Sequence, residues 1–331
     1  MTEPRKWLIT GSAGFIGSNL AKTLLNNGQA VVGLDNFFSG FPRNIDRLER
    51  IGGGRFEFVE GSILDADKLE QAIQGCDVVV HLAAQVSVMR SFDLPYETLQ
   101  INEEGFLAVH QAAVRNGVSR MVYASTCAVY GDNPALPLSE TEMPRPLSPY
   151  AASKLGNENW AQSLAVKAPG LVTVGLRFFN VFGAWQDPHG GYAAVIPKWI
   201  DALLQNQPIT VFGDGSATRD FCHVDNICHA IQLAAAPDFT PNYPCYNIGT
   251  GVESSLMDLY QQISAALQDY GVDLSGVVPQ HAPPRSGDIV RSVGDIQRAQ
   301  TDMGYRPLVS LTEGLRRIFA EVPPIKWQEA S

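Results

Sequence analysis

Two residues of the segment "SPYAASK", Tyr150 and Lys154, are spaced so that they could carry out acid–base chemistry together. Residues four apart share one face of a helix, so a helical segment would place the phenol beside the ammonium group. A free tyrosine has a pKa of about 10 and is a poor base at neutral pH. A neighbouring positive charge favours the phenolate and lowers that pKa. The spacing therefore predicts a tyrosine that takes a proton from a substrate hydroxyl.

A second stretch, "ASTCAVYGD", places the hydroxyls of Ser125 and Thr126 beside the thiol of Cys127. It follows the apolar run "RMVY", so we expect the three groups at the end of a buried strand. All three side chains are small and reactive, and the stretch alone leaves open which of them acts.

A glycine-rich turn near the start of the chain predicts a phosphate-binding site. In "TGSAGFIGS", Gly11, Gly14 and Gly17 lie where a strand runs into a helix. The first glycine permits the tight turn, the second permits close approach of a pyrophosphate, and the third permits the helix to pack on the strand. Asp35 ends the next apolar run about twenty residues later, where a carboxylate accepts hydrogen bonds from a ribose diol. That carboxylate repels a 2′-phosphate, so the pattern favours NAD over NADP.

Short apolar runs alternate with longer amphipathic ones, which is typical of parallel strands joined by helical crossovers. The expected strands are 6–11, 30–35, 55–61, 77–84, 120–125, 172–180 and 243–251, and the expected helices include 14–28, 65–75 and 103–117. After Asn180 the rhythm breaks, and proline and glycine become frequent. We expect an α/β protein with a doubly wound parallel sheet of the Rossmann type. Its nucleotide-binding domain would comprise 1–180 plus 222–249, and a smaller, interleaved α/β lobe would comprise 181–221 plus 250–331.

Composition excludes several classes of function. Of 331 residues, 45% are hydrophobic and 18% charged, which is ordinary for a globular chain with a sizeable core. The net charge of -10 argues against nucleic-acid binding, and no apolar run approaches the roughly 18 to 20 residues of a membrane span. The start of the chain lacks a signal-peptide pattern. Five cysteines without a Cys-x-x-Cys pair indicate reduced thiols in a cytoplasmic protein and no metal site.

Together these motifs resemble the extended short-chain dehydrogenase/reductase family, and within it the NAD-dependent nucleotide-sugar epimerases. The resemblance covers essentially the whole chain and is carried by "TGSAGFIGS", "HLAAQVSV", "ASTCAVYGD", "SPYAASK", "LRFFNVFG" and "TRDFCHVDN". In that family a Ser or Thr at the end of the fifth strand joins the tyrosine and lysine. The matching position is Thr126, so the resemblance implies the catalytic set Thr126, Tyr150 and Lys154.

The resemblance implies a reversible oxidation and reduction at carbon 4 of a UDP-sugar, with tightly bound NAD and a 4-keto intermediate. Relatives that dehydrate or decarboxylate sugars carry Asp or Glu just after the catalytic Thr. Here Cys127 and Ala128 stand there, which disfavours elimination. We interpret Cys127 as a small residue that faces the sugar, not as an acid–base group. A non-catalytic NAD-binding sensor is disfavoured because Thr126, Tyr150 and Lys154 are all present.

The resemblance also implies which residues hold NAD. They are expected in the glycine turn, after the second, third and fourth strands, and beside the tyrosine. The set is Gly11, Gly14, Phe15, Ile16, Gly17, Asp35, Asn36, Ser39, Gly40, Ser62, Ile63, Leu82, Ala83, Ala84, Asn102, Tyr150, Lys154 and Phe178. Ser62 stands where relatives commonly have an Asp that contacts adenine.

For the UDP-sugar, the resemblance implies phosphate contacts from Arg219 and Arg285, a ribose contact from Asp288, and uracil walls in 193–199 and 209–215. The full set is Ser87, Thr126, Cys127, Tyr150, Asn180, Ala194, Val195, Trp199, Val211, Phe212, Arg219, Arg285, Asp288 and Ser292. The gatekeeper position of the sugar pocket falls on Ser292. A small residue there leaves room for a 2-acetamido group, which is similar to epimerases of N-acetylated UDP-hexosamines. UDP-glucuronate and UDP-glucose or UDP-galactose remain alternatives.

Family members commonly pair as homodimers through two helices from each copy. The corresponding segments are 94–116 and 149–167. The run "LAVHQAA" has suitable apolar spacing, but such spacing fits an intramolecular face equally well.

Overall fold

The computed structural model describes residues 4–189, 194–284 and 289–322. A seven-stranded sheet forms the larger lobe, with every pair of neighbouring strands parallel. The strand order is β11-β6-β5-β4-β1-β2-β3. The bounds are β1 (Lys6–Thr10), β2 (Ala30–Asp35), β3 (Phe56–Glu60), β4 (Val78–His81), β5 (Arg120–Thr126), β6 (Val172–Phe178) and β11 (Cys245–Ile248). This order is that of a doubly wound Rossmann sheet with one added strand, and the expected fold class is confirmed.

Helices cover both faces of the sheet because side chains along each strand alternate between its two faces. Trp7 and Ile9 of β1 belong to one apolar core, and Leu8 between them belongs to the other. The first core includes side chains of α1 (Phe15–Asn26), α2 (Pro42–Gly52) and α9 (Val224–Ala234). The second includes side chains of α3 (Ala66–Ile73), α6 (Gly105–Arg115) and α7 (Pro149–Ala165). Strands buried on both faces explain the near-continuous apolar runs of the sequence.

Helix α7 carries the tyrosine and lysine of the "SPYAASK" segment. It begins at Pro149, and the hydroxyl of Ser148 accepts a hydrogen bond from the Ala151 amide at 3.1 Å. Proline in the first turn and serine at the N-cap are standard helix-start residues. The predicted helical spacing of Tyr150 and Lys154 is therefore confirmed.

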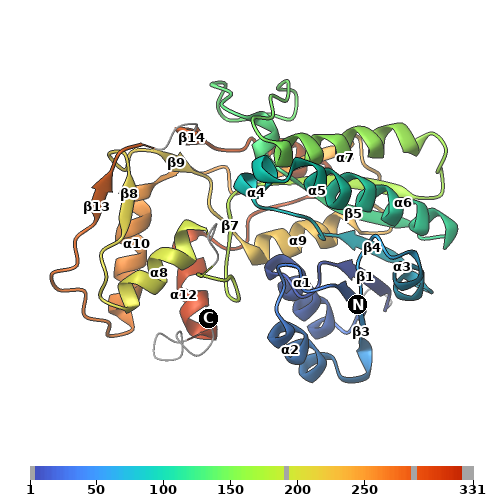
Figure 1. The fold of residues 1–331 in the computed structure, drawn as a ribbon, viewed down its shortest axis with the longest axis horizontal. Coiled ribbons are helices and arrows are strands. Elements are labelled where there is room, and N and C mark those ends of the chain that lie inside the picture. Colours follow the sequence, from blue (N-terminus) through green and yellow to red (C-terminus); the bar gives the residue numbers. More distant parts are fainter. Residues whose placement is uncertain (1–3, 190–193, 285–288, 323–331) are drawn as a thin grey trace.

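The helical segment between β4 and β5 is less regular than the sequence suggests. Helices α4 (Val88–Asp93) and α5 (Pro95–Leu99) lead into a π-helical turn, Gln100–Glu104, and then into α6. Figure 1 shows α5 and α6 running beside α7 on one side of the sheet, and α5 and the π turn pack against α7. A π turn within a helix often marks a functional position, but apolar spacing does not reveal it.

The smaller lobe lies beside the sheet, on the left in Figure 1. Its core joins three helices with short strands. The helices are α8 (Val195–Leu204), α10 (Leu256–Asp269) and α12 (Leu311–Glu321). The strands form three small sheets: β8 (Thr210–Phe212) with β13 (Gln280–Ala282), β7 (Val181–Phe182) with β10 (Cys222–His223), and β9 (Thr218–Arg219) between β12 (Ser254–Ser255) and β14 (Arg291–Ser292).

The chain returns to the large sheet twice after Asn180. Strand β11 pairs with β6 at the sheet edge, and α9 packs against α1. Helix α11 (Gln297–Met303) also packs on β11, and Ala299, Met303 and Tyr305 belong to the core of the large lobe. The sequence-based prediction assigned all of 250–331 to the smaller lobe, whereas α11 packs on the large sheet. The boundary between the two domains stays a prediction.

All five cysteines have unpaired thiols. Within the described ranges, no helix is both long and apolar enough to cross a membrane.

Candidate active site

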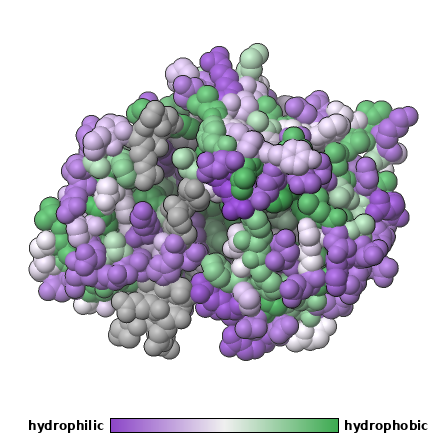
Figure 2. Space-filling model, viewed as in Figure 1, coloured by the Kyte–Doolittle hydropathy of each residue, from purple (hydrophilic) through white to green (hydrophobic). Residues whose placement is uncertain are grey.

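One cavity of about 640 Å³ lies at the carboxyl ends of the parallel strands, between the two lobes. Figure 2 shows the surface hollowed between the lobes on the face in view. Residues that end or follow β1, β2, β4, β5 and β6 line it, among them Gly11, Asp35, Leu82, Thr126 and Phe178. Strand order reverses between β1 and β4, and ligands bind such sheets at this switch point.

The glycine turn makes a cradle that side chains would fill. Gly11 has φ of +75°, and a Cβ there would lie 2.8 Å from the Ala83 amide nitrogen. A Cβ at Gly17 would lie 2.1 Å from the carbonyl oxygen of Gly11. Glycine at these two positions allows the turn to lie tightly against both the loop after β4 and helix α1. The backbone is thereby left open to a pyrophosphate, as a dinucleotide requires.

Helix α1 begins directly after this turn, and its N-cap, Gly14, makes no side-chain capping bond. First-turn amides and the positive end of the helix dipole therefore face the cavity, which suits a phosphate. At the end of β2, Asp35 accepts hydrogen bonds from the amides of Ala13 at 2.9 Å and Phe37 at 2.7 Å. Burial raises the pKa of the Asp35 carboxyl, and these amide bonds oppose that effect. The residues present thus fit NAD.

The structure places most of the expected NAD-binding residues in the cavity wall. These are Gly11, Gly14, Phe15, Ile16, Gly17, Asp35, Asn36, Ser39, Ser62, Ile63, Leu82, Ala83, Ala84, Tyr150, Lys154 and Phe178. Gly40 and Asn102 do not line it. A Cβ at Gly40 would lie 2.7 Å from that of Ala13, so glycine there permits close packing. Asn102, in the π turn, accepts from the Gln85 amide at 2.8 Å and donates to the Ser153 hydroxyl at 2.9 Å, which holds the loop after β4 to α7.

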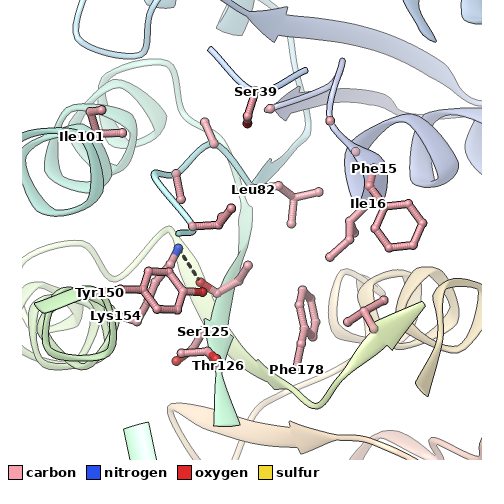
Figure 3. A pocket seen from close by; sticks show the side chains of 18 of the residues that line it. Phe15, Ile16, Ser39, Leu82, Ile101, Ser125, Thr126, Tyr150, Lys154 and Phe178 are labelled. Carbon is pink, nitrogen blue, oxygen red and sulfur yellow. Dashed lines mark hydrogen bonds between the residues drawn. The ribbon is translucent and has the colours of Figure 1, made fainter. Parts of the chain in front are cut away.

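Tyr150, Thr126 and Lys154 converge at the end of β5. The Tyr150 phenol lies near the Thr126 hydroxyl, which favours the phenolate, and Thr126 Oγ1 accepts a hydrogen bond from the Ala128 amide at 3.2 Å. Lys154 Nζ donates to the carbonyl oxygen of Ala124 at 3.1 Å, drawn as the dashed line in Figure 3. In that view Phe15, Ile16 and Phe178 lie across the cavity from Tyr150. Since Thr126 already accepts one bond, its proton is free to be donated to the tyrosine oxygen.

Burial dominates the protonation of this pair. It raises the pKa of Tyr150 to about 12, and the Thr126 hydrogen bond opposes the rise. Burial also lowers the pKa of Lys154 to about 8. The expectation that Lys154 lowers the pKa of Tyr150 stays a prediction, since burial is the largest influence on Tyr150 without ligands. In the structure Lys154 ties α7 to β5 through the carbonyl of Ala124.

Acid groups are scarce in this cavity. Among the described residues that line it, Asp35 is the only carboxylic acid, and it lies at the end of β2. Cys127 and Ala128, which follow Thr126, both line the wall. Burial raises the pKa of the Cys127 thiol to about 11. The reacting end of the cavity therefore holds hydroxyls and a protonated thiol, which cannot expel a hydroxyl as a carboxylic acid does.

The substrate-binding predictions divide into three groups. Thr126, Cys127, Tyr150, Asn180, Arg219 and Ser292 line the cavity; Ser87, Ala194, Val195, Trp199, Val211 and Phe212 do not; Arg285 and Asp288 lie outside the described residues. Trp199 and Val211 are buried in the core of the smaller lobe. Ser87 caps α4 by accepting from the Arg90 amide at 3.1 Å. Apolar spacing alone could not separate core residues from ligand walls.

Several further residues line the cavity that the sequence analysis did not select. They are Leu34, Phe38, Gly61, Val86, Val88, Ile101, Ala124, Ser125, Ala128, Phe179, Val181, Gln186 and Ile289. Most lie within two residues of a predicted site residue, near the ends of the expected strands. Their position at those strand ends is the sequence feature that could have identified them. Phe38, Val86 and Val88 are also exposed apolar residues, which points to a binding surface.

Comparisons with known proteins agree with this geometry. A sequence model described as "NAD dependent epimerase/dehydratase family" matches residues 7–249. A UDP-glucose 4-epimerase of Mycolicibacterium smegmatis is 38% identical over 94% of this chain and 96% of its own length. Two solved structures are similar in fold. A UDP-glucose 4-epimerase of Thermotoga maritima with UDP-glucose has a TM-score of 0.86 and 34% identity, covering 96% of this chain and 99% of its own. A UDP-N-acetylglucosamine 4-epimerase of Methanobrevibacter ruminantium in complex with UDP-N-acetylmuramic acid has a TM-score of 0.87 and 33% identity, covering 97% and 100%.

Proposed function

This chain belongs to the NAD dependent epimerase/dehydratase family, and on that premise we propose that it inverts carbon 4 of a UDP-N-acetylhexosamine. It is an NAD-dependent UDP-sugar 4-epimerase, and the relatives described above are 4-epimerases of UDP-glucose or UDP-N-acetylglucosamine. The finer proposal is the interconversion of UDP-N-acetylglucosamine and UDP-N-acetylgalactosamine through a 4-keto intermediate. The observation that carries it is the contact between Cys127 and Ser292.

Cys127 and Ser292 bound the cavity near Tyr150 with two small side chains. Both residues line the cavity, and the Ser292 hydroxyl lies close enough to the Cys127 thiol to oppose the rise in its pKa. Ser292 pairs in register with Arg219, which brings a guanidinium group, suited to phosphate oxygens, to the same wall. Two small residues leave volume for a 2-acetamido group where a bulky aromatic residue would exclude it.

The proposed mechanism uses the hydroxyl pair at the end of β5. Tyr150 reacts as the phenolate, which the Thr126 hydroxyl stabilises, and its Oη takes the proton of the sugar 4-hydroxyl to become a phenol. Lys154, held on the carbonyl of Ala124, contributes a fixed positive charge to the same end of the cavity. NAD, when bound, supplies the acceptor and donor for the hydrogen at carbon 4 and a positive nicotinamide charge. Tyr150 then returns its proton to the 4-oxygen after the keto sugar has turned.

A second candidate substrate is a UDP-hexose without the acetamido group. Two of the relatives described above are named UDP-glucose 4-epimerases, and one of them is crystallised with UDP-glucose. Small residues at 127 and 292 permit a large sugar but do not reject a small one. UDP-glucuronate is a third possibility for the same reason.

One experiment separates these substrates. Purified protein is offered UDP-N-acetylglucosamine, UDP-glucose and UDP-glucuronate separately, without added cofactor, and the products are resolved by NMR. We expect inversion of the acetamido sugar, with Tyr150→Phe as the inactive control, since proton transfer contributes about 10²–10⁴-fold to rate. Turnover of the uronate alone would exclude the acetamido proposal.

Pairing of two copies through 94–116 and 149–167 stays a prediction. These segments correspond to α5, the π turn and α6 on one side and α7 on the other. Tyr96 and Trp160 are exposed apolar residues on them. Light scattering of the purified protein decides the oligomeric state.

A further inference from the structure

A row of polar side chains crosses three neighbouring strands beneath α7, one residue before the catalytic Thr126. Ser125 on β5 pairs in register with Arg177 on β6, and Arg177 pairs with Asn247 on β11. Aligned residues of parallel strands face the same side of the sheet. All three are buried, with exposed fractions of 3%, 5% and 0%. Polar groups in such a place are costly unless each finds partners.

Glu158 of α7 supplies the partner from above the sheet. Its carboxylate accepts two bonds from Arg177, Nε to Oε1 at 2.9 Å and Nη2 to Oε2 at 2.6 Å. It also accepts a hydrogen bond from the hydroxyl of Ser125. A bidentate pair between a guanidinium and a carboxylate fixes orientation as well as distance. Helix α7 is therefore held on both β5 and β6 at this level.

The position of Glu158 on the helix relates it to the chemistry. Tyr150, Lys154 and Glu158 follow at intervals of four residues, so they lie on one face of α7 in successive turns. They contact Thr126, the carbonyl of Ala124 and the hydroxyl of Ser125 respectively, three consecutive residues of β5. Glu158 is the anchor of this set that lies farthest from the cavity, and it is not part of the cavity wall.

Arg177 also holds the segment that follows Thr126. Its Nη1 donates to the hydroxyl oxygen of Tyr130 at 2.8 Å, and that hydroxyl donates to Asn247 Oδ1 at 2.7 Å. Tyr130 ends the short helical turn that begins at Cys127. One guanidinium group thus connects the catalytic helix, the turn after Thr126 and the outermost strand.

We propose that Glu158, Arg177 and Tyr130 are positioning residues that set the register of α7 on β5, and with it the contact between Tyr150 and Thr126. A buried ion pair is a weak source of net stability, because desolvation of both charges offsets their attraction. The bidentate geometry instead determines where the phenol stands relative to its hydroxyl partner. This inference rests on the proposed function only in taking Tyr150 and Thr126 as the reacting pair.

The test uses variants that separate two effects: displacement of Tyr150 from Thr126, and the destabilisation caused by a buried charge without a partner. Glu158→Gln leaves the Arg177 charge unpaired, whereas the double variant E158Q/R177M removes both charges. For the double variant we expect a melting temperature close to that of the original protein, an unchanged KM, full NAD content, and a kcat about 100-fold lower, as for a displaced catalytic group. The matched control is Glu70→Gln, which breaks an exposed pair with Arg115 between α3 and α6 and should leave kcat unchanged.

A milder variant, Tyr130→Phe, keeps the ring and removes only the hydroxyl that joins Arg177 to Asn247. We expect a kcat about tenfold lower, with KM unchanged. The proposal is overturned if the double variant folds and keeps the original kcat. If the Glu158 variants do not fold, an unchanged kcat in Tyr130→Phe overturns it instead. All rates are measured with the UDP-sugar that the unaltered protein turns over best. Failure of the proposed function is distinct, since no UDP-sugar would then react with the unaltered protein.

Discussion

Cys127 and Ser292 lie beside each other in the cavity wall, on either side of the boundary between the two lobes. Cys127 follows the end of β5 in the large sheet, and Ser292 ends β14 in the smaller lobe. This arrangement brings Cys127, the neighbour of the proposed catalytic residue Thr126, against Ser292, the residue expected to control sugar size. The width of the cavity at this contact is therefore set jointly by both lobes.

Replacing Ser292 with tyrosine should change the substrate range. The larger ring would fill the space beside Cys127, so activity on the acetamido sugar should be lost while activity on UDP-glucose is spared. Ser292→Ala, which adds no volume, is the control and should keep both activities. NMR of the products measures both, and equal survival of the two activities in Ser292→Tyr would show that this position is not the gatekeeper.

Replacing Cys127 with alanine should leave epimerisation largely intact. The thiol, with a pKa raised to about 11 by burial, stays protonated at neutral pH and is a poor base. Steady-state kcat and KM of Cys127→Ala provide the measurement. A fall of about 100-fold or more in kcat, the scale of lost acid–base catalysis, would instead make the thiol a participant in proton transfer.

Replacing Gly17 with alanine should abolish NAD binding. A Cβ there would meet the carbonyl oxygen of Gly11 at 2.1 Å, a backbone atom that can give way only if the turn itself moves. The control is Gly54→Ala, where no atom lies within 4 Å of the added Cβ and φ is not positive. NAD content after purification, read by absorbance of the released cofactor, checks both. Retention of full NAD content by Gly17→Ala would contradict the assignment of the turn.

Stability should fall as pH rises above about 9 because of the buried thiols. Burial raises the pKa of Cys76 and of Cys228 from 9.0 to about 12, and the other three thiols shift in the same direction. Between pH 9 and 12 an unfolded thiol has lost its proton while the folded one keeps it. Unfolding then releases protons, so the free energy of unfolding decreases with pH, by up to about 1.4 kcal/mol per pH unit per thiol.

Lys154 makes the free energy of unfolding increase with pH, because its folded pKa of about 8 lies below the ordinary value of 10.5. This single amine opposes five thiols, so we expect a net decrease. Urea unfolding at pH 8 and pH 10 measures the net slope. Cys228→Ala should show a shallower decline than the unaltered protein. An identical decline in the two proteins would show that this thiol does not contribute.

The sequence predicted the large sheet well because its signals are local. Strands buried on both faces appear as continuous β-branched runs, and each of the seven expected strands is present with ends shifted by three residues or fewer. The π turn at Gln100–Glu104 and the return of α11 to the large core were not predicted. Both depend on contacts made after the chain has folded, as Asn102 shows by holding Gln85.

Within the site, residue types and spacing determined the glycine turn, the carboxylate after β2, the tyrosine–lysine pair and the lack of an acid after Thr126. These features arise from a few adjacent residues at the ends of strands. Only the tertiary structure decided that Trp199 and Val211 belong to a core, that Cys127 meets Ser292, and that Glu158 lies on Arg177. It also decided the pKa of Tyr150, because desolvation depends on everything packed around a group and not on its neighbours along the chain.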